Sequence, residues 1–157
     1  MTLGTISYPF DRAVRWLKIC LEKDLITEPV FIQHGATDVS SIINHPLVQA
    51  EPTIPNEQWI DLVCTSRLII SHAGQGSTRM LAEKNARFFL LPRLALYREH
   101  VDDHQIMFAR SIKATGITYC LTIEDFQTLL KSPPPPYTGN IFTGPRLAEF
   151  LLKKYPQ

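Results

Sequence analysis

A short apolar run followed by two glycines and a serine is typical of a site for a phosphate group. Residues 68–71 (LIIS) carry no charge, and the turn His72-Ala73-Gly74-Gln75-Gly76-Ser77 follows them, with a helical pattern after it. Such a run indicates a strand that is buried on both faces of a parallel sheet. Glycine lets the backbone turn sharply, and the free N–H groups in the first turn of the next helix attract an anion. Taken alone, the turn fits phosphate binding and a simple tight turn equally well.

The turn does not match the common nucleotide-binding patterns. Arg79 or Met80 stands where G-x-G-x-x-G needs its third glycine, and no Lys-Ser/Thr pair completes a P-loop. The G-x-S-x-G pattern of a hydrolase is also missing. His72 directly follows the buried run, so a structural histidine and a ligand contact are equally good interpretations. Gly4-Thr5, at the end of the first predicted strand, could likewise cradle an oxyanion or simply turn the chain, and Gln33-His34-Gly35 repeats this arrangement more weakly.

A second polar cluster occupies residues 92–105 (PRLALYREHVDDHQ), which follow a predicted strand and lead into a predicted helix. Its donors and acceptors suit a polyhydroxylated ligand, and they are Arg93, Glu99, His100, Asp103, His104 and Gln105. The competing interpretation is a solvated loop in which Asp102 and Asp103 stabilise the helix dipole. His100 and His104 are four residues apart, but Val101 replaces the glutamate of H-E-x-x-H and no third ligand is evident, so we expect no metal site.

Strands and helices alternate along the chain and must position these motifs. The apolar patterns predict strands over residues 2–5, 30–33, 47–50, 68–71, 88–91 and 119–121. They predict helices over residues 11–23, 56–64, 76–85 and 101–115, the last of them ending at Gly116, and another helix starting after Thr122. This alternation predicts an α/β fold, a parallel sheet with helices on both faces. Ligands of such sheets bind at the carboxyl ends of the strands, where residues 4–10, 34–41, 72–77 and 93–104 would gather.

Composition narrows the class of protein. The 157 residues suffice for one domain, and 45% hydrophobic with 20% charged residues excludes a disordered or fibrous chain. A net charge of +1 gives no basic surplus for nucleic acid, no apolar run approaches the roughly 18 residues of a membrane span, and no secretory signal is seen. Cys20, Cys64 and Cys120 are far apart, which favours buried thiols in the reducing cytoplasm.

Four consecutive prolines, residues 133–136, follow the last predicted helix of the domain. They favour a stiff extended segment. We therefore expect a domain over residues 1–131 and a proline-rich linker over residues 132–144. A C-terminal helix over residues 145–157 would pack on the domain or on a partner.

Taken together, the motifs resemble the C-terminal domain of family 28 glycosyltransferases of the GT-B type. The resemblance is strongest to the small separate subunits that occur in bipartite UDP-sugar transferases of dolichol-oligosaccharide synthesis and of bacterial exopolysaccharide and capsule synthesis. It rests on residues 2–5 (TLGT), 9–12 (PFDR), 71–77 (SHAGQGS) and 92–105, which span about two thirds of the chain.

The resemblance implies a single Rossmann-like domain, the donor-binding half of a GT-B enzyme. In relatives the loop that matches residues 74–77 lies against the diphosphate, and the positions that match His104 and Gln105 touch the donor sugar. The implied UDP-sugar-binding residues are Gly4, Thr5, His72, Gly74, Gln75, Gly76, Ser77, Glu99, His100, Asp103, His104 and Gln105. The implied activity is a metal-independent inverting transfer of a hexose from a UDP-sugar to a lipid-linked saccharide, with no further cofactor.

A GT-B enzyme needs two such domains and this chain supplies one. The resemblance therefore implies a heterodimer with a membrane-anchored, acceptor-binding glycosyltransferase subunit. That partner would carry the catalytic base and recruit the chain to the cytoplasmic face of the membrane.

One departure favours an alternative. Met80 stands three residues beyond Ser77, where relatives carry Glu or Asp for the ribose hydroxyls, and Glu83 lies one helical turn later. The chain could then be a non-catalytic partner or activator of a glycosyltransferase. A nucleotide-sugar epimerase is a third hypothesis, which a single lobe disfavours.

Overall fold

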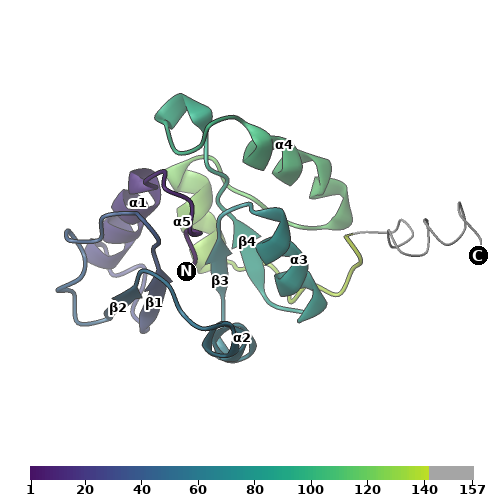
Figure 1. The fold of residues 1–157 in the computed structure, drawn as a ribbon. Helices are drawn as coiled ribbons and strands as arrows, with labels where there is room; N and C mark the ends of the chain where they lie inside the picture. The colour runs from purple at the N-terminus through teal and green to yellow at the C-terminus, as the bar shows by residue number, and fades with distance from the viewer. Residues whose placement is uncertain (142–157) are drawn as a thin grey trace, which may run out of the picture.

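The computed structural model describes residues 1–141, and within this part the chain is a mixed α/β protein (Figure 1). The α-helices are α1 (Asp11–Glu22), α2 (Asn56–Thr65), α3 (Gln75–Glu83), α4 (His104–Ser111) and α5 (Ile123–Lys131). The strands are β1 (Val30–Gln33), β2 (Val48–Glu51), β3 (Ile69–Ser71) and β4 (Phe88–Leu90), and two short 3-10 helices are η1 (Ala95–Tyr97) and η2 (Lys113–Thr115).

The described strands form two parallel pairs, β1 with β2 and β3 with β4. Thr2 links the pairs, because it forms parallel bridges to Gln33 on one side and Ser71 on the other. The strand expected over residues 2–5 is thus a single bridge, since Gly4 at a φ of +82° turns the chain out of the sheet. The strand expected over residues 119–121 is also reduced to one bridge, from Tyr119 to Leu90, and the cap of α5 follows at once.

Helices cover both faces of the β3–β4 pair. Successive residues of a strand point to opposite faces, and here Ile70 and Phe89 join one core cluster while Ile69 and Phe88 join the other. The first cluster is completed by α1 and α5, and the second by α2, α3 and α4. In Figure 1, α1 and α5 accordingly lie on one side of β3 and β4, and α3 and α4 lie on the other.

The helix ends follow local chemistry. Thr122 caps α5 by accepting a hydrogen bond from the backbone N–H of Asp125 at 3.1 Å, which confirms the predicted start. The helix expected over residues 101–115 begins only at His104, because Asp102 accepts from its N–H, and its last turn is the 3-10 helix η2. Gly116 stops it at a φ of +94°, as predicted.

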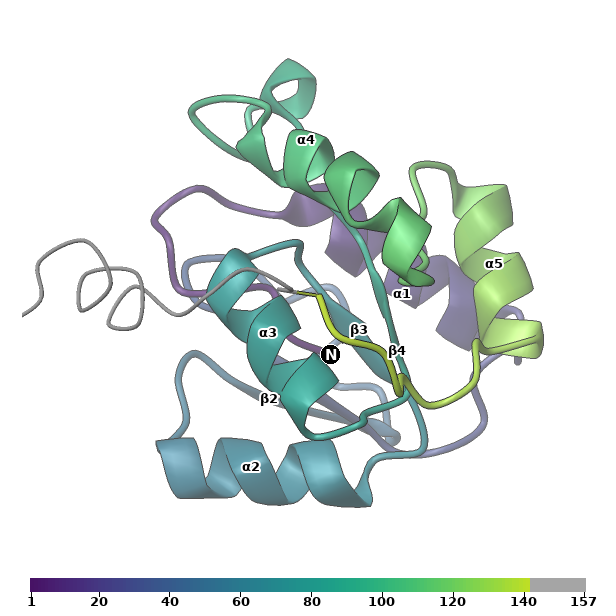
Figure 2. The ribbon, with the colours of Figure 1, turned by 90° about the vertical axis from the view of Figure 1, so that its right-hand side faces the viewer.

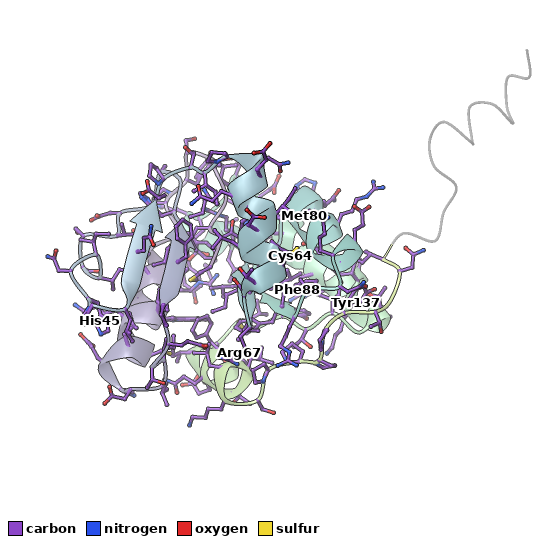
Figure 3. The ribbon with its side chains drawn as sticks, turned by 90° about the horizontal axis from the view of Figure 1, so that it is seen from below. His45, Cys64, Arg67, Met80, Phe88 and Tyr137 are labelled. Atoms are coloured by element: carbon purple, nitrogen blue, oxygen red, sulfur yellow. The ribbon has the colours of Figure 1, made fainter. Side chains whose placement is uncertain are left out.

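The structure corrects one expectation about the cysteines and describes part of the proline-rich segment. Cys20 and Cys120 are buried, but the interpretation of Cys64 as a buried thiol is wrong, because this residue lies on the exposed side of α2. The proline-rich segment runs back along the domain: the N–H of Tyr137 donates to Ala86 O at 3.0 Å, and its ring meets Phe88 edge-on (Figure 3).

The rest of the proline-rich linker and the expected C-terminal helix over residues 145–157 lie outside the described residues. Among residues 1–141, none of the helices has the length and apolarity needed to cross a membrane.

Candidate functional site

A cleft of about 320 Å³ opens at the carboxyl ends of the strands. It lies where the first extended segment, β1, β2 and β3 end and where α2 and α3 begin. Figure 2 shows the starts of α2 and α3 on the same side of the molecule. The lining residues are Thr2, Gly4, Thr5, Ile6, Gln33, Thr53, Ile54, Asn56, Trp59, His72 and Ser77. Four of the predicted binding residues therefore share one cavity, namely Gly4, Thr5, His72 and Ser77.

The ring of His72 is enclosed by two glycines. A Cβ on Gly4 would stand 2.9 Å from His72 Nε2, and a Cβ on Gly74 would stand 2.4 Å from the same atom. Gly4 also has a φ of +82°, which favours glycine, whereas at position 74 any larger residue would have to displace the ring of His72. The pKa of His72 falls from 6.5 to about 4, mainly because the ring is buried and also because the charge of Arg93 is nearby. The imidazole is neutral at pH 7, and its Nδ1 is buried with no hydrogen-bond partner among the described residues.

The start of α3 offers its backbone donors to the cleft. No side chain of residues 1–141 caps this nine-residue helix, and the first N–H that an intrahelical bond occupies is that of Thr78, which donates to Gly74 O. Gly76 has no described heavy atom within 4 Å of the position of a Cβ, so the first turn is open. Such a turn attracts an anion through its N–H groups and the helix dipole. Gln75 and Gly76 are exposed beside the cleft.

Glu99, one of the predicted ligand contacts, is buried in an ion pair with Arg12. The Arg12 Nη2 and Glu99 Oε2 atoms are 2.8 Å apart, and the two side chains are 5% and 3% exposed. Arg12 also donates to Pro92 O and lies over the ring of Trp16 at 4.8 Å. The pair joins α1 to the loop after β4, so in this structure Glu99 holds the loop instead of facing the cleft.

Gln105, another predicted contact, supports Arg93. Gln105 Oε1 accepts from the backbone N–H of Arg93 at 3.1 Å. The guanidinium of Arg93 is fully buried and donates to Leu3 O at 2.7 Å, Tyr8 O at 2.7 Å and Glu99 O at 2.8 Å. Burial lowers the pKa of Arg93 to about 10, which still leaves it cationic at pH 7. Arg93 thus ties residues 3–8 to residues 93–105.

The remaining members of the polar cluster are accessible. His104 is 77% exposed, and Asp102 bridges it to His100. Asp103 accepts from the N–H of Ala95 at 3.1 Å. The ring of Tyr8 stacks on His100 with 6.3 Å between their centroids.

The two motifs lie at the same edge of the molecule. Tyr8 touches His100, and Thr5 and Ile6 of the same loop line the cleft. The charge of His100 also contributes to the lowered pKa of His72. Residues 100–105 do not line the cleft itself. His100 is connected to it through the loop of residues 5–8, His104 is exposed, and Glu99 and Gln105 lie beneath the surface.

Sequence reasoning missed four lining residues of the cleft, Thr53, Ile54, Asn56 and Trp59. They follow β2 or open α2, so the rule that ligands meet the carboxyl ends of strands could have found them. Met80 packs against a core cluster, and Glu83 pairs with Arg79 at 2.9 Å at the far end of α3. In this arrangement Glu83 does not replace the carboxylate that relatives carry at the position of Met80.

A larger cavity of about 580 Å³ lies at the opposite, amino ends of the strands. Apolar side chains such as Leu17, Val48 and Leu62 line it, and its two charged lining residues, Glu28 and Arg67, pair with each other. It contains none of the predicted site residues, so we place the candidate site at the carboxyl ends.

Most of the exposed large apolar side chains lie on the loops that carry the two motifs. Seven large hydrophobic side chains are exposed in residues 1–141, and all except Ile43 lie on residues 4–10, residues 94–101 or α4. These six are Ile6, Tyr8, Leu96, Tyr97, Val101 and Met107, here called the apolar rim. Contiguous exposed apolar side chains mark interaction sites more often than scattered ones do.

Within residues 1–141 no group of three or more His, Cys, Asp or Glu side chains could hold a metal ion. Comparison with known proteins found no family model, no curated protein and no solved structure that matches this chain.

Proposed function

We propose that the chain binds a UDP-sugar in the cleft at the carboxyl ends of its strands. It is then the donor-binding catalytic subunit of a metal-independent inverting glycosyltransferase, which moves a hexose to a lipid-linked saccharide in exopolysaccharide or glycolipid synthesis. The observation that carries this proposal is the uncapped start of α3, which opens beside a cleft whose wall is a neutral His72 held by Gly4 and Gly74. In this proposal the fold is the Rossmann-like donor half of a GT-B enzyme, for which helices on both faces of parallel strands are favourable evidence.

The proposed transfer of the hexose needs hydrogen-bond donors that are oriented toward the diphosphate. The N–H groups of residues 75–77 bind the diphosphate and stabilise the charge that grows on the departing UDP. A cleft of about 320 Å³ with Trp59 and Ile54 in its wall suits the nucleoside. In this proposal His100, which stacks on Tyr8, and the exposed His104 contact the sugar. The base that activates the acceptor hydroxyl belongs to the partner in this proposal.

The apolar rim supports the proposed partner. A membrane-anchored, acceptor-binding subunit that covers the rim would also close over the cleft, since Ile6 belongs to both. Interfaces of this kind bury more than about 1,000 Å². The chain would then work at the cytoplasmic face of the membrane, recruited by that subunit.

Calorimetry with UDP tests the proposal. Gly76→Trp should abolish binding, because the indole fills the open first turn of α3. The matched control is Glu83→Trp, at the exposed far end of the same helix, which should bind UDP as the natural chain does. Transfer of the hexose should appear only after the partner subunit is added. Absence of UDP binding by the natural chain, alone and in the complex, would reject the proposal.

The packing of Met80 favours a second candidate, a non-catalytic partner or activator subunit. A thioether that packs on the core cannot bond to ribose hydroxyls, and a missing carboxylate forfeits about 1.5–3 kcal/mol per charge-assisted hydrogen bond. Met80→Glu should strengthen UDP binding, with Met80→Gln as the uncharged control. If the natural chain binds no UDP and only Met80→Glu does, the second candidate is correct.

A further inference from the structure

The carboxylate of Asp102 holds two imidazoles. Asp102 Oδ2 lies 2.5 Å from His104 Nδ1, and Asp102 Oδ1 lies 3.0 Å from His100 Nδ1. Oδ1 also accepts from the backbone N–H of His104 at 3.0 Å. The hydrogen bond from this N–H is the main reason that the pKa of Asp102 is below its usual value, so the group is a carboxylate at neutral pH.

This geometry decides where the hydrogen of His104 resides. An ionised carboxylate accepts hydrogen bonds and cannot donate one. His104 Nδ1 faces Asp102 Oδ2, so Nδ1 must carry the hydrogen and Nε2 of the neutral ring is left as an acceptor. His100 differs, because its Nδ1 faces both Asp102 Oδ1 and the Asp102 backbone N–H, the latter at 3.3 Å. Asp102 therefore sets the tautomer of His104 and leaves that of His100 open.

The surroundings of Asp102 keep this pair in place. Tyr8 stacks on His100, and Asp103 accepts from the N–H of Ala95, which fixes the loop on either side. Beneath the loop, the buried Arg93 donates to the carbonyl oxygens of Tyr8 and Glu99. His104 itself remains exposed, so its Nε2 is available to a ligand that enters beside the cleft.

We propose that Asp102 is a positioning residue of the donor site, which keeps the hydrogen of His104 on Nδ1 so that Nε2 accepts a hydrogen bond from a hydroxyl of the donor's sugar. The inference rests on the proposed function, and it assigns a role to a residue outside the predicted binding set. The contact of His104 with the sugar is what the resemblance already implies, and the tautomer agrees with it, since a neutral Nε2 acceptor attracts a hydroxyl and repels a phosphate oxygen.

The purely structural alternative is that Asp102 only caps α4. Asp102→Asn separates the two roles. The amide oxygen can still accept from the backbone N–H of His104, so the cap is kept. The amide NH₂ can donate to His104 Nδ1, which allows the tautomer with its hydrogen on Nε2. Glu124→Gln is the matched control. It removes one exposed carboxylate charge from the first turn of another helix, α5, which contributes no residue to the predicted binding set or to the cleft.

The experiment combines nitrogen NMR of the imidazoles at pH 8 with calorimetry on the full chain, using UDP, UDP-glucose and UDP-N-acetylglucosamine. In the natural chain the spectra should show hydrogen on His104 Nδ1, and in Asp102→Asn they should show a mixture of tautomers. We compare the ratio of two affinities, that for the better-bound UDP-sugar over that for UDP. Asp102→Asn should lower this ratio by about tenfold, which corresponds to the loss of one hydrogen bond. Glu124→Gln should change neither the tautomer of His104 nor the affinity ratio. His104→Ala should lower the affinity ratio by the same factor. The double variant Asp102→Asn/His104→Ala should lower it no further, because Asp102 acts through His104.

Three outcomes would overturn the inference. If UDP-sugars bind but Asp102→Asn leaves the tautomer and the affinity ratio unchanged, Asp102 is only a cap and the proposed function stands. If Asp102→Asn weakens UDP and UDP-sugars equally, Asp102 does not act through the sugar. If the natural chain binds none of the three nucleotides, the proposed function and the inference fail together.

Discussion

The imidazole of His72 lies so close to Gly74 that a Cβ built on this glycine would stand 2.4 Å from Nε2. Gly74 has a φ of −74°, so alanine would suffer no backbone strain there. We predict that Gly74→Ala lowers the free energy of unfolding by about 1–3 kcal/mol, because the ring must move within a packed site. The control is Gly76→Ala, because a Cβ built there has no described atom of the rest of the protein within 4 Å, the helix's own backbone left aside. We expect its free energy of unfolding to stay the same or to rise by up to about 1 kcal/mol. Equal denaturation midpoints for the two variants would mean that the ring of His72 does not lie close to position 74.

The same enclosure makes stability depend on pH. The pKa of His72 falls from 6.5 to about 4 on folding, because burial disfavours the imidazolium. The unfolded chain then binds more protons than the folded chain between these values, so stability is complete above pH 6.5 and declines as the pH falls to 4. At about 1.4 kcal/mol per pKa unit the decline attributable to His72 is about 3 kcal/mol.

His72→Gln isolates this contribution from that of the carboxylates. Urea unfolding at a series of pH values should show a shallower decline in the variant between pH 6.5 and 4. Curves that run parallel in the two proteins would mean that His72 is accessible to protons in the folded state.

The ion pair between Arg12 and Glu99 is buried, so its two charges depend on each other. Glu99→Gln should lower the free energy of unfolding by about 3–5 kcal/mol, since it leaves the guanidinium in the core without a counter-charge. The control is Glu22→Gln, which breaks an exposed pair with Lys18 at 3.8 Å and should cost less than about 0.5 kcal/mol. Chemical denaturation measures both, and similar losses would mean that the Arg12–Glu99 pair is hydrated.

The elements of this fold follow from apolar periodicity. β1 occupies residues 30–33 as predicted, and α1 ends one residue before the predicted end. For α1 the cause is local, because Val14, Leu17 and Leu21 repeat with the helical period and are buried in the structure. The predicted strand of residues 2–5 failed where Gly4 takes a positive φ, a conformation that sequence alone does not reveal.

The candidate site was predictable only in part, and the reason is distance along the chain. Residues such as His72 and Ser77 belong to one turn, so their grouping at the cleft follows from local pattern. Glu99 pairs with Arg12 across 87 positions, and a polar residue in a loop after a strand looks the same whether it binds a ligand or a distant guanidinium. The burial of Gln105 under Arg93 has the same origin.

Tyr137 tests whether the proline-rich segment belongs to the folded domain. Its ring packs edge-on against Phe88, its N–H donates to Ala86 O, and its hydroxyl is buried without a partner among residues 1–141 (Figure 3). Tyr137→Ala should therefore lower the free energy of unfolding by about 3 kcal/mol or more, through the lost contacts and the cavity left behind. Tyr137→Phe is the matched control and should be neutral or stabilising by about 1 kcal/mol, because it removes a buried hydroxyl that has no hydrogen bond. Thermal or urea unfolding measures both variants. A large loss confined to Tyr137→Ala would mean that the place of Tyr137 in the second core cluster stabilises the domain, whereas a harmless Tyr137→Ala would mean that residues 132–141 add nothing to its stability.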